Sequence, residues 1–126
     1  WSPECERVSW RGKVTSAAKG AQFVGHNRRG TMRWVTFGTV VAAEPGRHFA
    51  FDVYVGPLKL SLWEYFIAPH EDGRGCTVAE QWTDRRSAVE RSVLERFFGK
   101  RNAVNRNGIH LTLVALKRAA ENSAYA

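Results

Sequence analysis

Two side chains, Glu80 and Tyr65, are the candidates for acid–base chemistry in this chain. Glu80 stands between Val78 and Trp82 in a run with a two-residue period, which places its carboxyl group on the apolar face of a strand. A carboxyl group removed from water has a raised pKa, so it can act as a general acid or base or hold the polar end of a ligand. The alternatives are a buried ion pair with an arginine, or an edge position where the carboxylate reaches water.

Motifs for metal and nucleotide chemistry are missing from the sequence. It contains no Walker loop, no Gly-x-Gly-x-x-Gly fingerprint and no His-Glu-x-x-His motif. Cys5 and Cys76 form no Cys-x-x-Cys pair, so we expect two reduced thiols, with a single disulfide as the alternative. The histidines fall in separate segments without metal-ligand spacing: His26, His48, His70 and His110. We therefore predict no metal and no cofactor.

The composition is typical of one globular domain. The 126 residues are 44% hydrophobic and 25% charged, which suits a single core. No apolar stretch approaches the ~20 residues of a membrane-spanning helix. The net charge of +7 can favour nucleic acid or anionic membranes. Because the basic residues are scattered and form no tail, we expect a solvated basic surface and no specific nucleic-acid partner.

The candidate residues lie on predicted strands and on one predicted helix. Turn signals such as Glu44-Pro45-Gly46-Arg47 separate β-rich runs, since Pro presets one turn angle and Gly accepts a positive φ. Six runs are predicted as strands: 4–10, 21–28, 33–42, 47–55, 59–68 and 76–83. Strands joined by such short turns pair most easily as an antiparallel meander.

The spacing of apolar residues becomes helical after the sixth run. Val89 and Val93 belong to a short predicted helix, and Gly99 interrupts it as a C-terminal glycine does. A longer amphipathic helix is predicted over about residues 101–121. Strands followed by helices, segregated along the chain, predict an α+β fold.

A sheet that curves around a long helix encloses volume where the facing side chains cannot fill it. Large aromatic side chains supply rigid walls for such a space, and the alternative is that the tryptophans only form the core. The predicted ligand-binding residues share the two facing surfaces: Trp34, Phe51, Val53, Trp63, Tyr65, Val78, Glu80, Trp82, Asn105, Ile109, Thr112 and Leu116.

Several segments of the chain resemble one family along nearly its whole length. They are WSPECERV (1–8), GAQFVGHNRRG (20–30), AEPGRHFAF (43–51), WEY (63–65) and RNG (106–108), followed by Leu113, Leu116-Lys117 and Glu121. These segments are similar to actinobacterial START-like proteins of the SRPBCC superfamily, the group named for polyketide cyclase/dehydrase and lipid transport.

The resemblance implies a helix-grip fold, with a curved antiparallel sheet around a long C-terminal helix. It implies binding or carrying of a hydrophobic small molecule, lipid-like or polyketide-like, in the cavity between them. The alternative is a metal-free cyclase or dehydratase in which Glu80 and Tyr65 are catalytic. We expect a cytoplasmic protein that does not span a membrane.

The start of the chain departs from the family pattern. Such proteins usually have a strand and short helices before the Trp-Ser-Pro segment, whereas this sequence begins at Trp1. We expect a single START-like domain over 1–126 whose N-terminal strand and helices are missing from the sequence given. The unpaired strand edge that results could instead be completed by a second copy, as a homodimer.

Overall fold

The computed structural model describes residues 1–124, apart from the side chains of residues 98, 102 and 124. Over these residues, six strands precede two helices: β1 (Cys5–Trp10), β2 (Gln22–Arg29), β3 (Met32–Glu44), β4 (His48–Val55), β5 (Leu58–Pro69), β6 (Cys76–Asp84), α1 (Ala88–Phe98) and α2 (Arg101–Ala124). Every predicted strand is present, with ends within about two residues of those predicted from turn signals. The predicted α+β class is confirmed.

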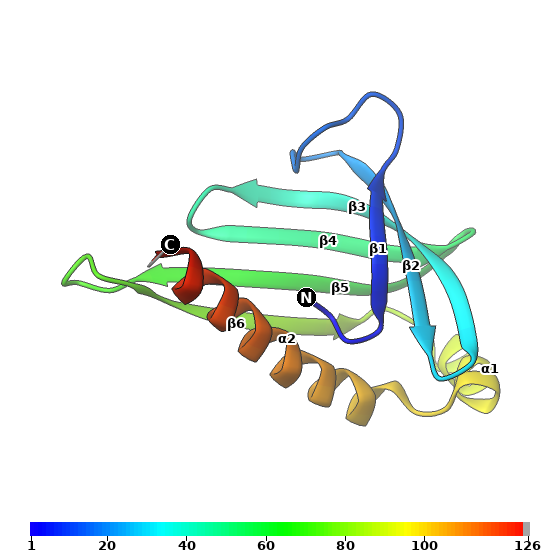
Figure 1. Ribbon diagram of the computed structural model, residues 1–126. Coiled ribbons are helices and arrows are strands. Elements are labelled where there is room, and N and C mark those ends of the chain that lie inside the picture. The colour runs from blue at the N-terminus through cyan, green and yellow to red at the C-terminus, as the bar shows by residue number, and fades with distance from the viewer. Residues whose placement is uncertain (125–126) are drawn as a thin grey trace.

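The six strands form one antiparallel sheet in the order β1-β2-β3-β4-β5-β6, which confirms the predicted meander. The sheet is strongly curved, so that β1 and β2 run steeply across the direction of β4 to β6, and α2 crosses its concave side (Figure 1). The long strand β3 joins the two parts, and its register with β4 shifts between Val40 and Ala42. Such an irregularity bends a strand and increases its twist.

An aromatic contact stabilises the sheet where it bends. Gly38 lies directly opposite Phe23, and a Cβ atom at Gly38 would overlap the Phe23 ring. The ring also meets Trp10 and Phe51 edge-on, with centroids 6.0 and 5.3 Å apart. Gly38 is therefore required by close approach, because only a residue without a side chain leaves room for the ring.

The cross-strand register determines which side chains share the concave face. Trp63 pairs with Trp82 and Tyr65 pairs with Glu80. Directly opposed residues project from the same face of a sheet. Glu80 therefore lies on the concave face, as the two-residue alternation predicted.

Helix α1 ends at the predicted glycine, whereas α2 begins at the predicted residue 101 but runs to Ala124, three residues past the predicted end. Ser87 caps α1 by accepting from the amide of Glu90, whose carboxylate accepts from the amide of Ser87 in return. The helix ends at Gly99, which has a φ of 75°. Helix α2 contacts mainly β6 among the strands. Neither helix in the described part of the chain is long and apolar enough to cross a membrane.

Few apolar side chains are fully buried. Among the described hydrophobic residues, only Ala21, Val40 and Ala50 are buried. The large aromatic residues of the concave face are half-buried instead. The space between the sheet and α2 is therefore not filled by side chains.

Candidate functional site

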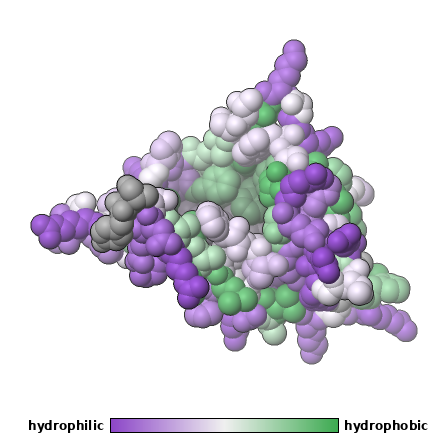
Figure 2. Space-filling model, in the orientation of Figure 1, coloured by the Kyte–Doolittle hydropathy of each residue, from purple (hydrophilic) through white to green (hydrophobic). Residues whose placement is uncertain are grey.

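A cavity of about 850 Å³ lies between the concave face of the sheet and α2. The space-filling view shows it as a hollow with a hydrophobic floor and a largely hydrophilic rim (Figure 2). Ligand pockets typically measure ~300–1,000 Å³ and are lined mainly by apolar side chains. The hollow is therefore large enough for a drug-sized or lipid-like molecule.

Eight of the twelve predicted ligand-binding residues line this cavity: Trp34, Phe51, Val53, Trp63, Tyr65, Trp82, Asn105 and Thr112. They come from β3, β4, β5, β6 and α2. The ring centroids of Trp63 and Trp82 lie 6.5 Å apart, and the rings of Phe51 and Tyr65 both pack against Phe49, at 5.7 and 6.4 Å. Aromatic pairs at such distances add rigidity beyond the area that they bury.

The other four predicted residues, Val78, Glu80, Ile109 and Leu116, do not line the cavity. Val78 and Glu80 share the face of Trp82 but lie further along β6, toward the β5–β6 hairpin. On α2 the lining positions include Val104, Asn105, Gly108, Leu111 and Thr112. These positions follow the three- and four-residue spacing of one helix face, which includes the predicted Asn105 and Thr112 but not Ile109 or Leu116.

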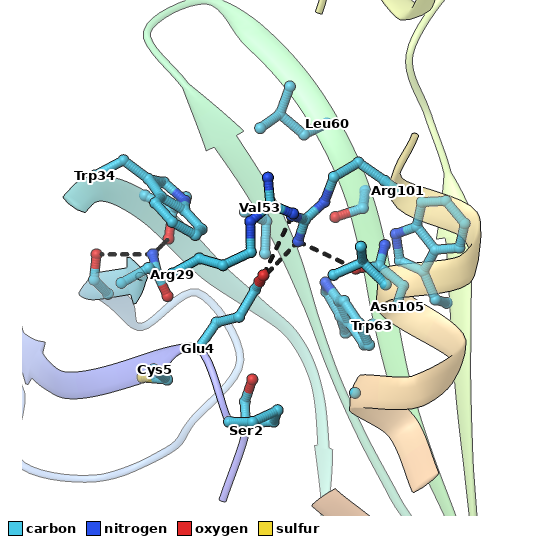
Figure 3. Close-up of a pocket in the computed structure, with 18 of the residues that line it drawn as sticks. Ser2, Glu4, Cys5, Arg29, Trp34, Val53, Leu60, Trp63, Arg101 and Asn105 are labelled. Carbon is cyan, nitrogen blue, oxygen red and sulfur yellow. Dashed lines mark hydrogen bonds and ion pairs between the residues drawn. The ribbon is translucent and has the colours of Figure 1, made fainter. Parts of the chain in front are cut away.

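A polar cluster at the N-terminal end of α2 faces the apolar wall. The carboxylate of Glu4 accepts from both terminal nitrogens of Arg101, at 3.3 and 2.8 Å. The same guanidinium donates to Oδ1 of Asn105 at 3.2 Å. Figure 3 shows Arg29 extending from the end of β2 toward this pair. Because these residues line the cavity, they can pair with the polar end of a bound molecule.

Tyr65 and Glu80 form a hydrogen-bonded pair on the concave face, at the edge of the cavity lining. The Tyr65 hydroxyl donates to Oε1 of Glu80 at 2.8 Å, and Oε2 of Glu80 has no hydrogen-bond partner among the described residues. Burial raises the pKa of the Glu80 carboxyl, an effect partly offset by the hydrogen bond from Tyr65. Burial, followed by the nearby carboxylate, raises the pKa of Tyr65 well above its usual range.

The Tyr65–Glu80 geometry decides what this pair can do. The Tyr65 proton is directed at Glu80, so any further hydrogen bond to the phenolic oxygen must be one that it accepts. While Glu80 is ionised, Tyr65 can accept a hydrogen bond from a ligand hydroxyl. It is a poor proton donor in that state, because its pKa is raised.

A buried arginine forms another part of the lining. Arg86 is 5% exposed and donates to both carboxylate oxygens of Asp84, each at 2.9 Å. The Arg86 hydrogen bond holds the pKa of Asp84 below its usual range. The charge of this cation is therefore balanced within the protein, and its stem supplies lining surface.

No sequence pattern predicts Glu4, Arg29, Arg86, Leu94 or Arg101 as lining residues. Glu4 and Arg101 are 97 positions apart, so no periodicity connects them. Glu4 and Arg29 lie in or next to predicted strands and in segments that resemble the family, but neither feature predicts that they line a cavity. Leu94 was assigned to a helical pattern, but that pattern does not indicate which surface the helix approaches.

The described residues contain no group of three or more His, Cys, Asp or Glu side chains that could hold a metal ion. Both cysteines are free, with Cys5 half-buried and Cys76 exposed. The polar atoms in the lining suit hydrogen bonding and charge pairing with an organic ligand.

The chain is similar to a protein of known structure. The solution NMR structure of the Polyketide_cyc-like protein Cgl2372 from Corynebacterium glutamicum superimposes with a TM-score of 0.60 at 31% sequence identity. The match covers 98% of this chain and 76% of that one. No family model and no curated protein matches the chain.

Proposed function

Because the chain belongs to the polyketide cyclase-like family of START-like (SRPBCC) proteins and has its helix-grip fold, we propose that it binds a hydrophobic small molecule between the sheet and α2. The observation that carries this proposal is the cavity of about 850 Å³ with its wall of aromatic side chains. A fully packed core would be more stable than an unfilled one, because empty apolar volume weakens a fold. A ligand that fills the space restores these contacts.

The polar cluster supports a ligand with one polar end. Arg101 and Asn105 line the cavity from the N-terminal part of α2, and Tyr65 lines it from β5. The remaining wall is dominated by aromatic and aliphatic side chains. An amphipathic lipid-like or polyketide-like molecule would match this division, with its apolar body against Trp63 and Trp82.

The experiment uses Gly108, which lines the cavity and would meet no heavy atom within 4 Å if given a Cβ atom. Gly108→Phe places a ring in the cavity, whereas Gly108→Ala adds one methyl group and serves as the matched control. Both substitutions favour the helix, by about 1 kcal/mol for Ala relative to Gly. Loss of binding in the Phe variant would therefore not reflect a weaker fold.

Binding is measured with cis-parinaric acid and with 1-anilinonaphthalene-8-sulfonate, after native mass spectrometry of the purified chain and extraction of any molecule that it carries. We expect the Gly108→Ala variant to bind as the original does and the Gly108→Phe variant to bind at least about tenfold more weakly. Equal affinities in the two variants, or no uptake by the original chain, would refute the proposal.

A second candidate function is favoured by the Tyr65–Glu80 hydrogen bond. In a metal-free cyclase or dehydratase, the Tyr65 oxygen would take a proton from the substrate while its own proton passes to the ionised Glu80. This relay uses Glu80 although Glu80 does not touch the cavity. Its test is the pH–rate profile on a polyketide substrate: Tyr65→Phe should abolish turnover, and Glu80→Gln, which has no carboxylate to accept the proton, should strongly reduce turnover and remove the acidic limb from any residual activity. A profile insensitive to both substitutions would exclude this mechanism.

A further inference from the structure

Helix α1 carries an apolar stripe that the protein leaves uncovered. Val89, Val93 and Phe97 are 74%, 51% and 75% exposed. Their spacing of four residues places them along one side of the helix. Scattered exposed hydrophobic residues are normal on a protein surface, whereas contiguous apolar surface marks interaction sites.

The stripe continues the apolar lining of the cavity. Leu94, one position after Val93, lines the cavity from α1. At the same side of the molecule, the β4–β5 turn presents Val55 and Leu58, which also line the cavity and are 42% and 37% exposed (Figure 1). Helix α1 therefore presents Leu94 to the cavity and the apolar stripe, on the adjoining part of its surface, to solvent.

The charges next to the stripe are unbalanced. The two acidic residues of α1 are engaged within the protein: Glu90 in the N-terminal cap and Glu95 with Arg86 at 4.0 Å. Arg96 and Lys100 are exposed, and neither forms an ion pair with any residue that the structure describes. The uncovered surface thus combines apolar side chains with uncompensated positive charge.

We propose that α1 docks the chain onto an anionic lipid bilayer. Val89, Val93 and Phe97 would enter the boundary between headgroups and acyl chains, with Arg96 and Lys100 against the lipid phosphates. This arrangement matches an amphipathic helix that lies in the plane of the interface, and it complements the net charge of +7. The docked surface adjoins the cavity lining, so an apolar molecule could pass between bilayer and cavity with little exposure to water. Docking itself does not depend on ligand binding.

The test is co-sedimentation of the full chain with two kinds of vesicle, phosphatidylcholine alone and an equal mixture of phosphatidylcholine and phosphatidylglycerol. We expect binding to the anionic vesicles that weakens as salt is added. The double variant Val89→Ser/Phe97→Ser should lose at least about tenfold in partitioning. Its matched control, Phe66→Ser, removes a ring that is 40% exposed on the other face of the sheet and should leave partitioning unchanged.

Charge is tested separately. Arg96→Gln and Lys100→Gln should each reduce partitioning about fivefold, whereas Arg74→Gln at the β5–β6 hairpin and Arg118→Gln on α2 should not. Circular dichroism verifies that every variant is folded. Equal binding to both vesicle types, or equal losses in the stripe variant and the Phe66→Ser control, would overturn the proposal. So would a dimer in light scattering that the stripe variant dissociates without any vesicle binding, because a second copy would then cover the stripe.

Discussion

The Tyr65 hydroxyl lies 2.8 Å from a carboxylate oxygen of Glu80, directly across the β5–β6 pair. The other oxygen of Glu80 is buried without a hydrogen-bond partner in the described part of the chain. This arrangement stabilises the ionised carboxylate only in part, because one oxygen has lost its water and gained no donor. The ionisation of Glu80 therefore opposes folding.

This relationship predicts how stability depends on pH. Burial raises the pKa of Glu80 in the folded state, so its contribution to stability is present below the ordinary pKa of a glutamate and is lost as pH rises through the raised value. Glu80→Gln should remove this loss and increase the free energy of unfolding near neutral pH by on the order of 1 kcal/mol. Urea denaturation of both proteins between about pH 4 and pH 8 measures this difference in the free energy of unfolding. Glu71→Gln, at an exposed hairpin tip, is the control, and an equal gain in that variant would contradict the assignment.

A second prediction concerns Asp84, for which the pH dependence has the opposite sign. Arg86 holds the pKa of Asp84 below its usual range, so the stability that this pair contributes is present above the ordinary aspartate pKa and is lost as pH falls through the lowered value. Asp84→Asn removes the closer counter-charge of the buried guanidinium and leaves only Glu95, at 4.0 Å, so it should cost about 2–4 kcal/mol at neutral pH. The difference from the original chain should shrink in acid. Glu44→Gln, at an exposed site, should change neither the free energy of unfolding at neutral pH nor its dependence on pH.

A third prediction concerns the ion pair that joins the start of the chain to α2. Glu4 and Arg101 have side chains only 20% and 22% exposed and two hydrogen bonds between them. Arg101→Met should destabilise the fold by about 1–3 kcal/mol, because the half-buried carboxylate loses its charged partner. The double variant Glu4→Gln/Arg101→Met should recover part of this loss in a double-mutant cycle.

The exposed pair Lys117–Glu121 on α2 provides a matched control, with side chains 71% and 56% exposed. Lys117→Met should change the free energy of unfolding by no more than about 0.5 kcal/mol. Similar losses at Lys117 and Arg101 would show that burial of the Glu4 pair has no consequence.

A fourth prediction concerns Gly38 at the bend of the sheet. Gly38→Ala places a methyl group inside the Phe23 ring, so the ring must leave its position and the fold should lose at least about 2 kcal/mol. The double variant Gly38→Ala/Phe23→Leu should be less destabilised than the sum of the two single variants. Thermal denaturation measures the stability of the double variant and of the two single variants. Gly108→Ala, where the added atom meets no heavy atom within 4 Å, should be neutral or stabilising. If the losses in stability from Gly38→Ala and Phe23→Leu were strictly additive in the double variant, the two side chains would not share this space.

Much of the fold could be predicted because its signals are local. Alternation placed Trp63, Tyr65 and Glu80 on one face, and the register of β5 with β6 confirms this arrangement. Gly99 was predicted to end α1, and it does so with a positive φ. Strand and helix periodicities are properties of a few neighbouring residues, so they can be read without knowledge of the rest of the chain.

The candidate site could be predicted only in part, because the cavity is a non-local feature. Alternation assigned Val78 to the same face as Trp82, but only Trp82 reaches the cavity, since the hollow does not extend along the whole of β6. Ile109 was likewise predicted to line the cavity together with Thr112. Only Thr112 does so, and its neighbour on the lining face of α2 is Gly108.

The sequence by itself determined the strands, the helices, the faces of the strands and the aromatic character of the concave surface, because each depends on residues close together in the chain. The tertiary structure alone decided which part of each face lines the cavity and brought Glu4 to Arg101. The curvature of the sheet and the angle of α2 result from packing between distant segments. No local pattern encodes them, so the polar cluster and the limits of the cavity appear only in the folded chain.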